Sequence, residues 1–364
     1  MLHVSEYRDS RLCRSIAERI AGISKSRMRI MEVCGTHTVS IFKNGIRSFL
    51  PENVSLVSGP GCPVCVTAQG EIDAAVDLAG RKNTIVATFG DMMRVPGSNS
   101  SLQQEKAAGK DIRMVYSASD AVDIAKGNPG SNVVFLGVGF ETTAPTVAAA
   151  VLSASAEGVE NFSVLCMHKL VPPALGALMR SDGVDIDGLL LPGHVSVIIG
   201  TMAYEDFFSE HRIPCAVAGF EPADILQGVM RLAEMTETNS PELENCYGRA
   251  VTRQGNPAAR KVMDTVFEPC DAQWRGLGLI EKSGLRFRRK YSNMDGAKRF
   301  TLPASVGSMP DGCSCGDILT GKKTPPECRL YGRSCTPSDP VGPCMVSSEG
   351  ACAAYFKYSR RLRR

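Results

Sequence analysis

Short apolar segments alternate with polar or glycine-rich loops and with helix-like segments over most of this chain. The apolar segments are RIMEV, NVSLVS, NTIVATF, NVVFLGVGF, FSVLCMHKL, GLLLPGH and IPCAVAGF. They are apolar at nearly every position instead of every second one, which is typical of strands buried on both faces of a parallel sheet. The pattern therefore predicts an α/β protein with two parallel-sheet α/β domains around a cleft.

The same pattern divides the chain into three parts. Residues 25–130 and 131–265 each contain one set of strand, loop and helix segments, and each set is expected to form one α/β domain. Over residues 266–364 strands become sparse, glycine and proline increase, and cysteines cluster. Residues 1–24 show the period of an amphipathic helix and are expected to accompany this third, loop-rich and helix-rich domain.

Bulk composition limits the classes of function. The net charge of +3 gives no basic excess that would indicate nucleic-acid binding. No apolar run approaches the ~18 residues that span a bilayer, and the N-terminus lacks the apolar core of a signal peptide. A cytoplasmic protein is therefore expected, and 14 cysteines in that compartment indicate metal or redox chemistry. Isolated cysteines are expected to be buried packing residues: Cys13, Cys166, Cys215, Cys246 and Cys270.

Unusual polar residues follow the predicted strands. In parallel sheets, ligands bind beyond the carboxyl ends of the strands, and glycines there let the backbone approach a ligand closely. Six loops of this kind are expected to line one cleft with thiols, imidazoles and carboxylates. Their residues are Cys34 and His37, Cys62 and Cys65, Asp91, Glu141, His194, and Glu221.

Two of these loops contain cysteine pairs or cysteine–histidine pairs. Cys34 and His37 are three positions apart, which suits a shared iron, copper or zinc ion, a histidine-activated nucleophile, or a buried cysteine beside a hydrogen-bonded histidine. Cys62 and Cys65 form a C-x-x-C pair, which is typical of a metal site or a reversible disulfide. No second C-x-x-C lies at zinc-ribbon distance, which argues against a structural zinc site. A redox pair is favoured over an inert pair.

The remaining loop residues are candidate catalytic groups. Glu141, in GFETT, has three interpretations: a general base, a partner that orients a metal ligand, or a carboxylate favoured by the dipole at a helix N-terminus. Asp91 in FGDMMRVPG and His194 in PGHVS are grouped with Glu141 because each follows a predicted strand.

Six cysteines fall within forty residues near the C-terminal end. Such a loop-rich and proline-rich segment has little apolar material for a core, so a bound iron–sulfur cluster would supply the missing cross-links. The spacings match neither ferredoxin pattern, and six thiols exceed the four that a cubane needs. Four cysteines on a structural zinc ion are the main alternative. The six are Cys313, Cys315, Cys328, Cys335, Cys344 and Cys352.

Taken together, the motifs resemble one family, the HypD hydrogenase maturation proteins. They are MEVCGTHT, GPGCPVC, TFGDMMRVPG, GFETTAP, PGHVS, GFEPADIL, RQGNPAA and CTPSDPVGPCMVSSEGACAAYFKY. The resemblance runs in order from about residue 30 to residue 358. It implies two α/β domains around a cleft, plus a [4Fe–4S] domain that is similar to ferredoxin–thioredoxin reductase.

The resemblance also implies a function and partners. The protein would be a scaffold for assembly of the Fe(CN)2CO unit of nickel–iron hydrogenase, not a turnover enzyme. Iron would be held between Cys34, with His37 near it, and a thiolate of a HypC-type chaperone. A HypE-type protein would donate cyanide, and a hydrogenase large-subunit precursor is a further expected partner.

Redox roles follow from the same resemblance. Cys62 and Cys65 would relay electrons between the cluster and the iron. The cluster ligands are expected to be Cys313, Cys328, Cys335 and Cys352, leaving Cys315 and Cys344 as an extra redox pair. Cyanide and carbon monoxide prefer low-valent iron, so assembly needs electrons: a cubane supplies one at a time and a dithiol stores two.

Two other functions fit parts of the pattern. A disulfide reductase of the ferredoxin–thioredoxin type shares the cluster and the dithiol but needs no site at Cys34 and His37. A purely structural zinc protein would use the C-terminal cysteines alone.

Overall fold

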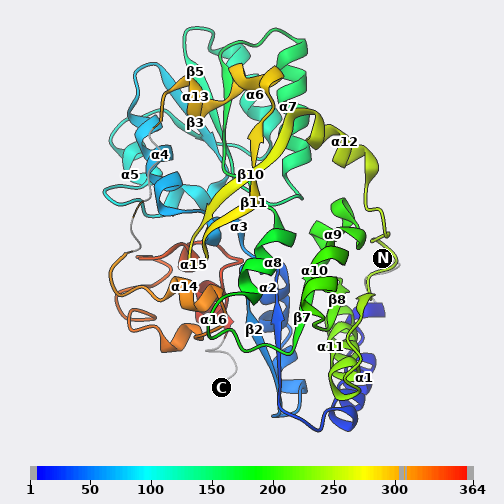
Figure 1. Ribbon diagram of the computed structural model, residues 1–364. Coiled ribbons are helices and arrows are strands. Elements are labelled where there is room, and N and C mark those ends of the chain that lie inside the picture. The colour runs from blue at the N-terminus through cyan, green and yellow to red at the C-terminus, as the bar shows by residue number, and fades with distance from the viewer. Residues whose placement is uncertain (1–5, 303–306, 308–309, 359–364) are drawn as a thin grey trace.

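Two parallel β-sheets, one β-hairpin and a cysteine-rich C-terminal segment make up the computed structural model, which describes residues 6–302, 307 and 310–358 (Figure 1). The first sheet has the order β2-β1-β7-β8-β9 and the second β4-β3-β5-β6, and both are wholly parallel. The predicted α/β class is therefore confirmed. The strands are β1 (Met28–Glu32), β2 (Val54–Ser58), β3 (Thr84–Thr88), β4 (Ile112–Met114), β5 (Asn132–Gly137), β6 (Phe162–Cys166), β7 (Gly188–Pro192), β8 (Cys215–Ala218) and β9 (Leu243–Asn245).

Helices cover both faces of each sheet. On the first sheet, α1, α2 and α11 pack on one face, and α9 and α10 on the other. On the second sheet, α6 and α7 cover one face, and α4, α5 and α8 the other. Their bounds are α1 (Ser10–Ile23), α2 (Gly35–Lys43), α4 (Gln69–Gly80), α5 (Leu102–Ala107), α6 (Ala118–Gly127), α7 (Ala144–Ala156), α8 (Val171–Met179), α9 (Gly193–Ile199), α10 (Glu205–His211) and α11 (Pro222–Glu237).

Alternate residues of the buried strands serve different cores. Met28 and Ile30 of β1 pack with α1, α2 and α11, whereas Met31 packs into a second core on the opposite face. This second core also contains Val134 and Leu136 of the second sheet and several C-terminal cysteines. One continuous apolar core therefore joins the two sheets and the C-terminal segment.

The sheets do not follow the expected division of the chain at residue 130. The first sheet combines β1 and β2 with β7, β8 and β9, while the second combines β3 and β4 with β5 and β6. Residues 25–130 and 131–265 therefore do not each form a sheet. An apolar pattern identifies strands, but it does not say which strands pair, so a chain that crosses between two sheets and returns is not visible in it.

The third expected part is also arranged differently. Helix α1 packs on α11 of the first sheet, not with the cysteine-rich segment. An antiparallel hairpin, β10 (Phe267–Trp274) and β11 (Gly278–Phe287), together with α12 (Pro257–Val266) and α13 (Gly296–Arg299), packs on the second sheet. Residues 1–5 and 359–364 lie outside the described residues.

The described C-terminal segment holds three short α-helices and the 3-10 helix η6 (Pro325–Glu327), connected by turns. The α-helices are α14 (Cys315–Leu319), α15 (Pro343–Val346) and α16 (Ala351–Tyr358). Helix α16 packs on α2, where the Phe42 and Tyr355 rings lie 4.4 Å apart and the Arg47 guanidinium covers both. In Figure 1 the segment lies beside both sheets.

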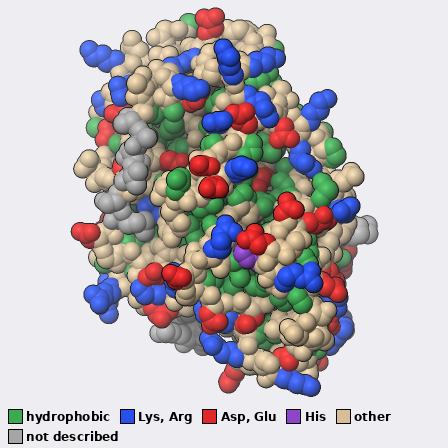
Figure 2. All heavy atoms as spheres, in the orientation of Figure 1, with side chains coloured by type: hydrophobic (Ala, Val, Ile, Leu, Met, Phe, Trp, Pro, Cys, Tyr) green, Lys and Arg blue, Asp and Glu red, His purple; other side chains and the backbone are tan. Residues whose placement is uncertain are grey.

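Surface charge agrees with the small net charge. On the face in Figure 2, described Lys and Arg side chains are interspersed with Asp and Glu, with no broad patch of one sign. Among the described residues, no helix combines the length and the apolar character needed to cross a bilayer.

Candidate functional site

All six predicted loops begin at the carboxyl end of a strand, and four of them lie where the order of a sheet reverses. From β1 the chain continues to β2 on one side, whereas β7 lies on the other side. Cys34 lies in the loop after β1, and His194 lies in the first turn of α9, directly after β7. In the second sheet, β3 and β5 have the same relation, and their loops carry Asp91 and Glu141. Such reversal points are the usual ligand sites of parallel sheets.

Cys34 lies against the loop that carries the C-x-x-C pair. It immediately precedes α2, and the N–H of the next residue, Gly35, donates to the carbonyl oxygen of Gly61 at 2.9 Å. A Cβ atom added to Gly61 would lie 2.2 Å from the backbone nitrogen of Cys34. Only glycine fits at Gly61, so the structure brings Cys34 beside the residue that precedes Cys62.

The Cys34 thiol is buried among acidic groups. It is 8% exposed, and burial raises its pKa to about 12. The Glu349 carboxylate raises this pKa further, while the backbone N–H groups of His37 and Thr36 lower it. Thr36 donates through Oγ1 to Oε1 of Glu349 at 2.7 Å, which fixes that carboxylate beside the thiol. The thiol therefore stays protonated at neutral pH unless a cation displaces the proton.

His37 is held in one tautomer. Its Nε2 lies 2.9 Å from the carbonyl oxygen of Gly219, so Nε2 carries the proton and Nδ1 carries the lone pair. Within the described part of the chain, Nδ1 has no hydrogen-bond partner. Burial lowers the pKa of His37 to about 4, so the ring is neutral. A neutral imidazole with a free lone pair is the form that metal ions bind.

His194 and His37 lie on the same aromatic ring. The His194 ring stacks on the Phe220 ring with 3.8 Å between the ring centroids. The centroid of the His37 ring lies 4.7 Å from that of Phe220. Partial burial lowers the pKa of His194. His194 is exposed, so it forms the outer side of this stack and His37 the buried side.

Cys62 and Cys65 form a disulfide across the first turn of α3 (Pro63–Val66). Both cysteines are buried. Helix α3 contacts α15, the short helix that carries Cys344. The pair therefore lies between the Cys34 loop on one side and the C-terminal cysteines on the other.

Glu141 is enclosed. Its Oε1 accepts a hydrogen bond from the N–H of Val171 at 2.9 Å, and its Oε2 has no partner among the described residues. Burial raises its pKa to about 7. The phenol of Tyr204 is also buried, and its pKa is raised by burial and by the nearby Glu141 and Cys34. Glu141 and Cys34 therefore both lie near the Tyr204 phenol.

A Glu141→Gln substitution should make stability less dependent on pH. The folded-state pKa of Glu141 lies above its unfolded value of 4.5, so its contribution is complete below pH 4.5 and is lost as pH rises through about 7. We expect the variant to gain about 3 kcal/mol relative to the native chain between pH 5 and pH 8. Urea unfolding of both proteins checks this. A difference in unfolding free energy between the two proteins that does not change with pH contradicts the prediction. Glu32, whose pKa is also raised, is present in both proteins, so its effect on this difference cancels.

Two predicted residues serve other contacts. Asp91 is half-buried, and its Oδ2 accepts a hydrogen bond from Ser347 Oγ at 2.8 Å, which ties the loop after β3 to the C-terminal segment. Glu221 pairs with Arg8 and precedes α11. The structure therefore places Asp91 at the joint between the second sheet and the C-terminal segment, and Glu221 under the N-terminal residues.

All six C-terminal cysteines line one small cavity. Its other walls are apolar, from Ile318, Leu330, Tyr331 and Met345, together with Gly342. The Sγ atoms of Cys315 and Cys344 lie 2.8 Å apart, and both residues are 1% exposed. Soft thiol donors around a dry cavity suit an iron–sulfur cluster. Among the described residues, no three Cys, His, Asp or Glu side chains converge on one point as ligands of a single ion do.

Three residues of the site have no distinctive sequence pattern. Glu32, at the end of β1, is 1% exposed, accepts the Cys34 N–H at 3.4 Å, and has its pKa raised to about 7 by burial. Glu349 and Tyr204 reach the site from segments far along the chain. The only signal for Glu32 was its place in MEVCGTHT.

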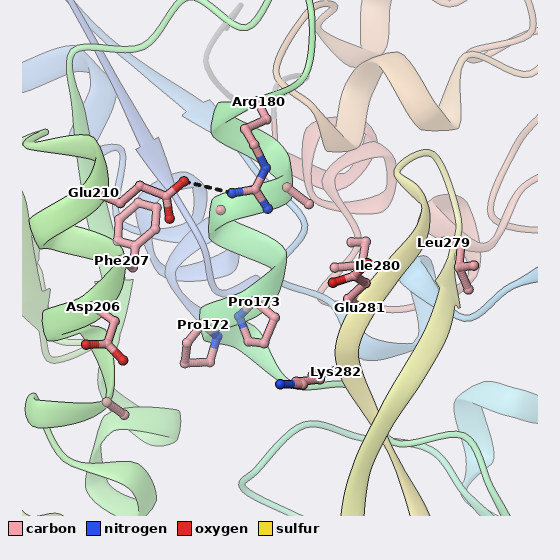
Figure 3. A pocket seen from close by; sticks show the side chains of 13 residues that line it. Pro172, Pro173, Arg180, Asp206, Phe207, Glu210, Leu279, Ile280, Glu281 and Lys282 are labelled. Atoms are coloured by element: carbon pink, nitrogen blue, oxygen red, sulfur yellow. Dashed lines mark hydrogen bonds and ion pairs between the residues drawn. The ribbon is translucent and has the colours of Figure 1, made fainter.

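A large surface groove lies apart from these thiols. It has a volume of about 610 Å³ between α8, α10 and the hairpin β10–β11. Figure 3 shows the Arg180–Glu210 ion pair on one side and Leu279 and Ile280 on the other. No cysteine or histidine is among its described lining residues.

Comparison with known proteins identifies the family. Residues 11–359 match the family described as "HypD: Hydrogenase formation hypA family". The chain belongs to the HypD family. A hydrogenase maturation factor HypD2 from Bradyrhizobium diazoefficiens is 45% identical over 370 residues, covering 99% of this chain and 97% of that protein. Hydrogenase maturation factor HypD of Escherichia coli K12 is 45% identical over 372 residues, covering 99% of each.

A third relative gives the same result. Hydrogenase maturation factor HypD of Cupriavidus necator is 45% identical over 372 residues, covering 99% of this chain and 98% of that protein. The expected resemblance to the HypD family is therefore confirmed, and with it a role in hydrogenase maturation.

Proposed function

We propose that this protein is the scaffold on which the Fe(CN)2CO unit of nickel–iron hydrogenase is assembled. Iron is the cargo, held by Cys34 with His37 beside it and by a thiolate of a HypC-type chaperone. The observation that carries the proposal is the placement of Cys34. It is a buried thiol at a sheet reversal point, three residues before a histidine whose Nδ1 has no partner among the described residues, and it lies against the loop of a second thiol pair.

The electrostatics of the pocket suit a cation. The pKa of the Cys34 thiol is raised to about 12 by burial and by Glu349, so the pocket disfavours a bare thiolate and favours one paired with a positive ion. Glu32, whose pKa is raised to about 7, accepts the Cys34 N–H and can take up the proton that iron binding displaces. Cyanide would come from a HypE-type protein, and the finished unit would pass to the hydrogenase large-subunit precursor.

The six thiols and apolar walls of the C-terminal cavity are the donors and surroundings that a [4Fe–4S] cluster prefers, and they support the proposal of one there. We propose Cys313, Cys328, Cys335 and Cys352 as its ligands, because Cys315 and Cys344 are within contact of each other and can form a separate redox pair. When bound, the cluster supplies electrons one at a time.

The Cys62–Cys65 pair converts single electrons into pairs. Opening its disulfide takes up two electrons, delivered in two steps by an external one-electron donor, and two protons from solvent, and gives two thiols. Closing it returns two electrons toward the iron and releases two protons. The contact of α3 with α15 and that of Gly61 with Cys34 support a relay through this pair.

Oxygen-free metal analysis tests the proposal. The purified protein should contain four iron and four acid-labile sulfide per chain, as a cubane requires, with visible absorption near ~400 nm. Addition of a HypC-type partner and ferrous ions should add one further iron per complex. A Cys328→Ala variant should lose the absorption. A colourless, iron-poor preparation that contains zinc would instead show the C-terminal segment to be a zinc site.

The main alternative is a disulfide reductase of the ferredoxin–thioredoxin type, since a cluster beside a dithiol is its layout. Turnover of a protein disulfide with reduced ferredoxin, unchanged in a Cys34→Ala variant, would favour that function. If no protein disulfide is turned over and iron capture requires Cys34, the scaffold function is favoured.

A further inference from the structure

A second surface groove, of about 470 Å³, lies where the loop after β3 meets the C-terminal segment. Arg94, the last residue of the 3-10 helix η3 (Gly90–Arg94), lines one side, and Val346 of α15 and Phe356 of α16 line the other. The Arg94 guanidinium joins the two sides, because Nη1 and Nη2 donate to the carbonyl oxygens of Pro337 and Val346, each at 3.1 Å.

The groove and the cavity of the six cysteines share a wall. Met345 lines both of them. It follows Cys344 in α15, and Ala353, another residue of the groove, follows Cys352 in α16. Because an electron crosses protein efficiently only over a short distance, a carrier docked in this groove would be well placed to reduce a cluster in the cavity.

Basic side chains surround the groove. Residues 310–364 carry nine Lys or Arg and five Asp or Glu, a net charge of +4, whereas the whole chain carries +3. Arg94 and Lys357 line the groove and are exposed. Arg333 is also exposed and follows Gly332, where an added Cβ atom would lie 3.8 Å from the Phe356 ring. Within the described residues, none of these three cations, here called the basic rim, forms an ion pair.

Two acids lie near the basic rim. Asp91 is half-buried and accepts a hydrogen bond from Ser347, and Asp339 is exposed in the turn after Pro337. Three cations against two acids leave the groove with a net positive charge. Behind them the wall is apolar, from Met345 and its neighbours. An apolar centre with a polar rim is the usual anatomy of a protein interface.

We propose that this groove docks an acidic protein of the ferredoxin type, which carries one electron on an iron–sulfur cluster. The inference rests on the proposed function, since it supplies the external donor that the Cys62–Cys65 pair requires. In each encounter the carrier is oxidised by one electron and the C-terminal cluster is reduced by one, so two encounters supply the two electrons that open the disulfide. The basic rim attracts an acidic carrier and speeds its encounter, and a small interface suits a partner that must leave after each transfer.

A double charge reversal tests the basic rim. The rim variant combines Arg333→Glu with Lys357→Glu, and both side chains are exposed, so the chain is expected to fold. The matched control combines Lys82→Glu with Lys110→Glu, which changes the net charge by the same amount. Both control residues are exposed and precede β3 and β4, at the end of the second sheet opposite to the loop that carries Arg94.

The probe is a purified acidic [2Fe–2S] ferredoxin. Calorimetry with oxidised ferredoxin measures docking on the full chain, and stopped-flow absorption under anaerobic conditions follows the oxidation of reduced ferredoxin. We expect the rim variant to bind ferredoxin about tenfold more weakly and to oxidise it about tenfold more slowly, and the control to match the native chain. Raising salt from about 0.1 M to about 1 M, which shortens the Debye length from ~10 Å to ~3 Å, should weaken native binding and remove the difference.

Each outcome decides one proposal. Ferredoxin that does not bind the native chain, binds the rim variant equally well, or is lost equally from the rim and control variants overturns the docking site. An acidic flavodoxin that binds where ferredoxin does not overturns the choice of occupant, as does a rim variant that loses only a HypC-type partner. If the rim variant does not fold, Arg333→Gln with Lys357→Gln is judged by the same criteria. If the chain holds no cluster, the proposed function fails, and calorimetry with oxidised ferredoxin still decides the docking site.

Discussion

A Cys34→Ala variant should keep its C-terminal cluster and lose its capacity to capture iron with a HypC-type partner. The substitution removes the one thiol at the reversal point of the first sheet, and His37 alone offers a single neutral nitrogen. Because loss of even a residue that only supports a metal ligand costs about 10–100-fold in affinity, we expect a loss of at least about 100-fold. Iron analysis of the complex, isolated without oxygen, measures this loss of iron binding.

The control is a second buried cysteine of the same domain. Cys13, in α1, is 5% exposed and packs in the core behind the first sheet. Cys13→Ala should bind iron like the native chain. Iron capture retained in Cys34→Ala, or lost equally in both variants, would show that Cys34 is not the iron ligand.

Replacing Gly61 with alanine should separate the two thiol loops without removing any thiol. The new Cβ would lie 2.2 Å from the Cys34 nitrogen and 2.5 Å from its Cα, and backbone atoms cannot move aside as side chains do. We expect an overpacking cost of about 1–3 kcal/mol in the free energy of unfolding. We also expect weaker iron capture than in the native chain, although Cys34, Cys62 and Cys65 are all present. Urea unfolding and iron analysis measure the two effects.

Gly22→Ala is the matched substitution. Nothing lies within 4 Å of a Cβ atom at Gly22, which is in α1. Alanine is the better helix former there, so stability should rise by up to about 1 kcal/mol. Unchanged stability and iron capture in Gly61→Ala would mean that the two loops are not in contact.

The class of fold was predictable from the sequence because both sheets are buried on two faces. Segments such as RIMEV and GLLLP, which are rich in apolar residues and bounded by turn signals, are typical of interior strands. Their pairing was not predictable. Ile30 pairs with both Leu56 and Gly188, and no local signal records a neighbour so distant in sequence.

The candidate site was likewise predictable only in part: some of its residues could be assigned to strand ends, and others could not be found. Cys34, Glu141 and His194 were placed correctly at strand ends because glycine and proline beside them mark those loops. Tyr204 carries no such mark, since an aromatic residue near a helix is ordinary. Its place in the site depends on burial there, which only the folded chain shows.

The path of the chain between its sheets has a consequence during synthesis. Strand β1 lacks one of its two neighbours until β7 has left the ribosome, because Ile30 pairs with Gly188. The nascent N-terminal third therefore cannot fold in isolation as a finished unit, and its folding is expected to be slow. Cys34 becomes enclosed only after most of the polypeptide has been made, so a partial chain offers no pocket in which a metal could be trapped prematurely.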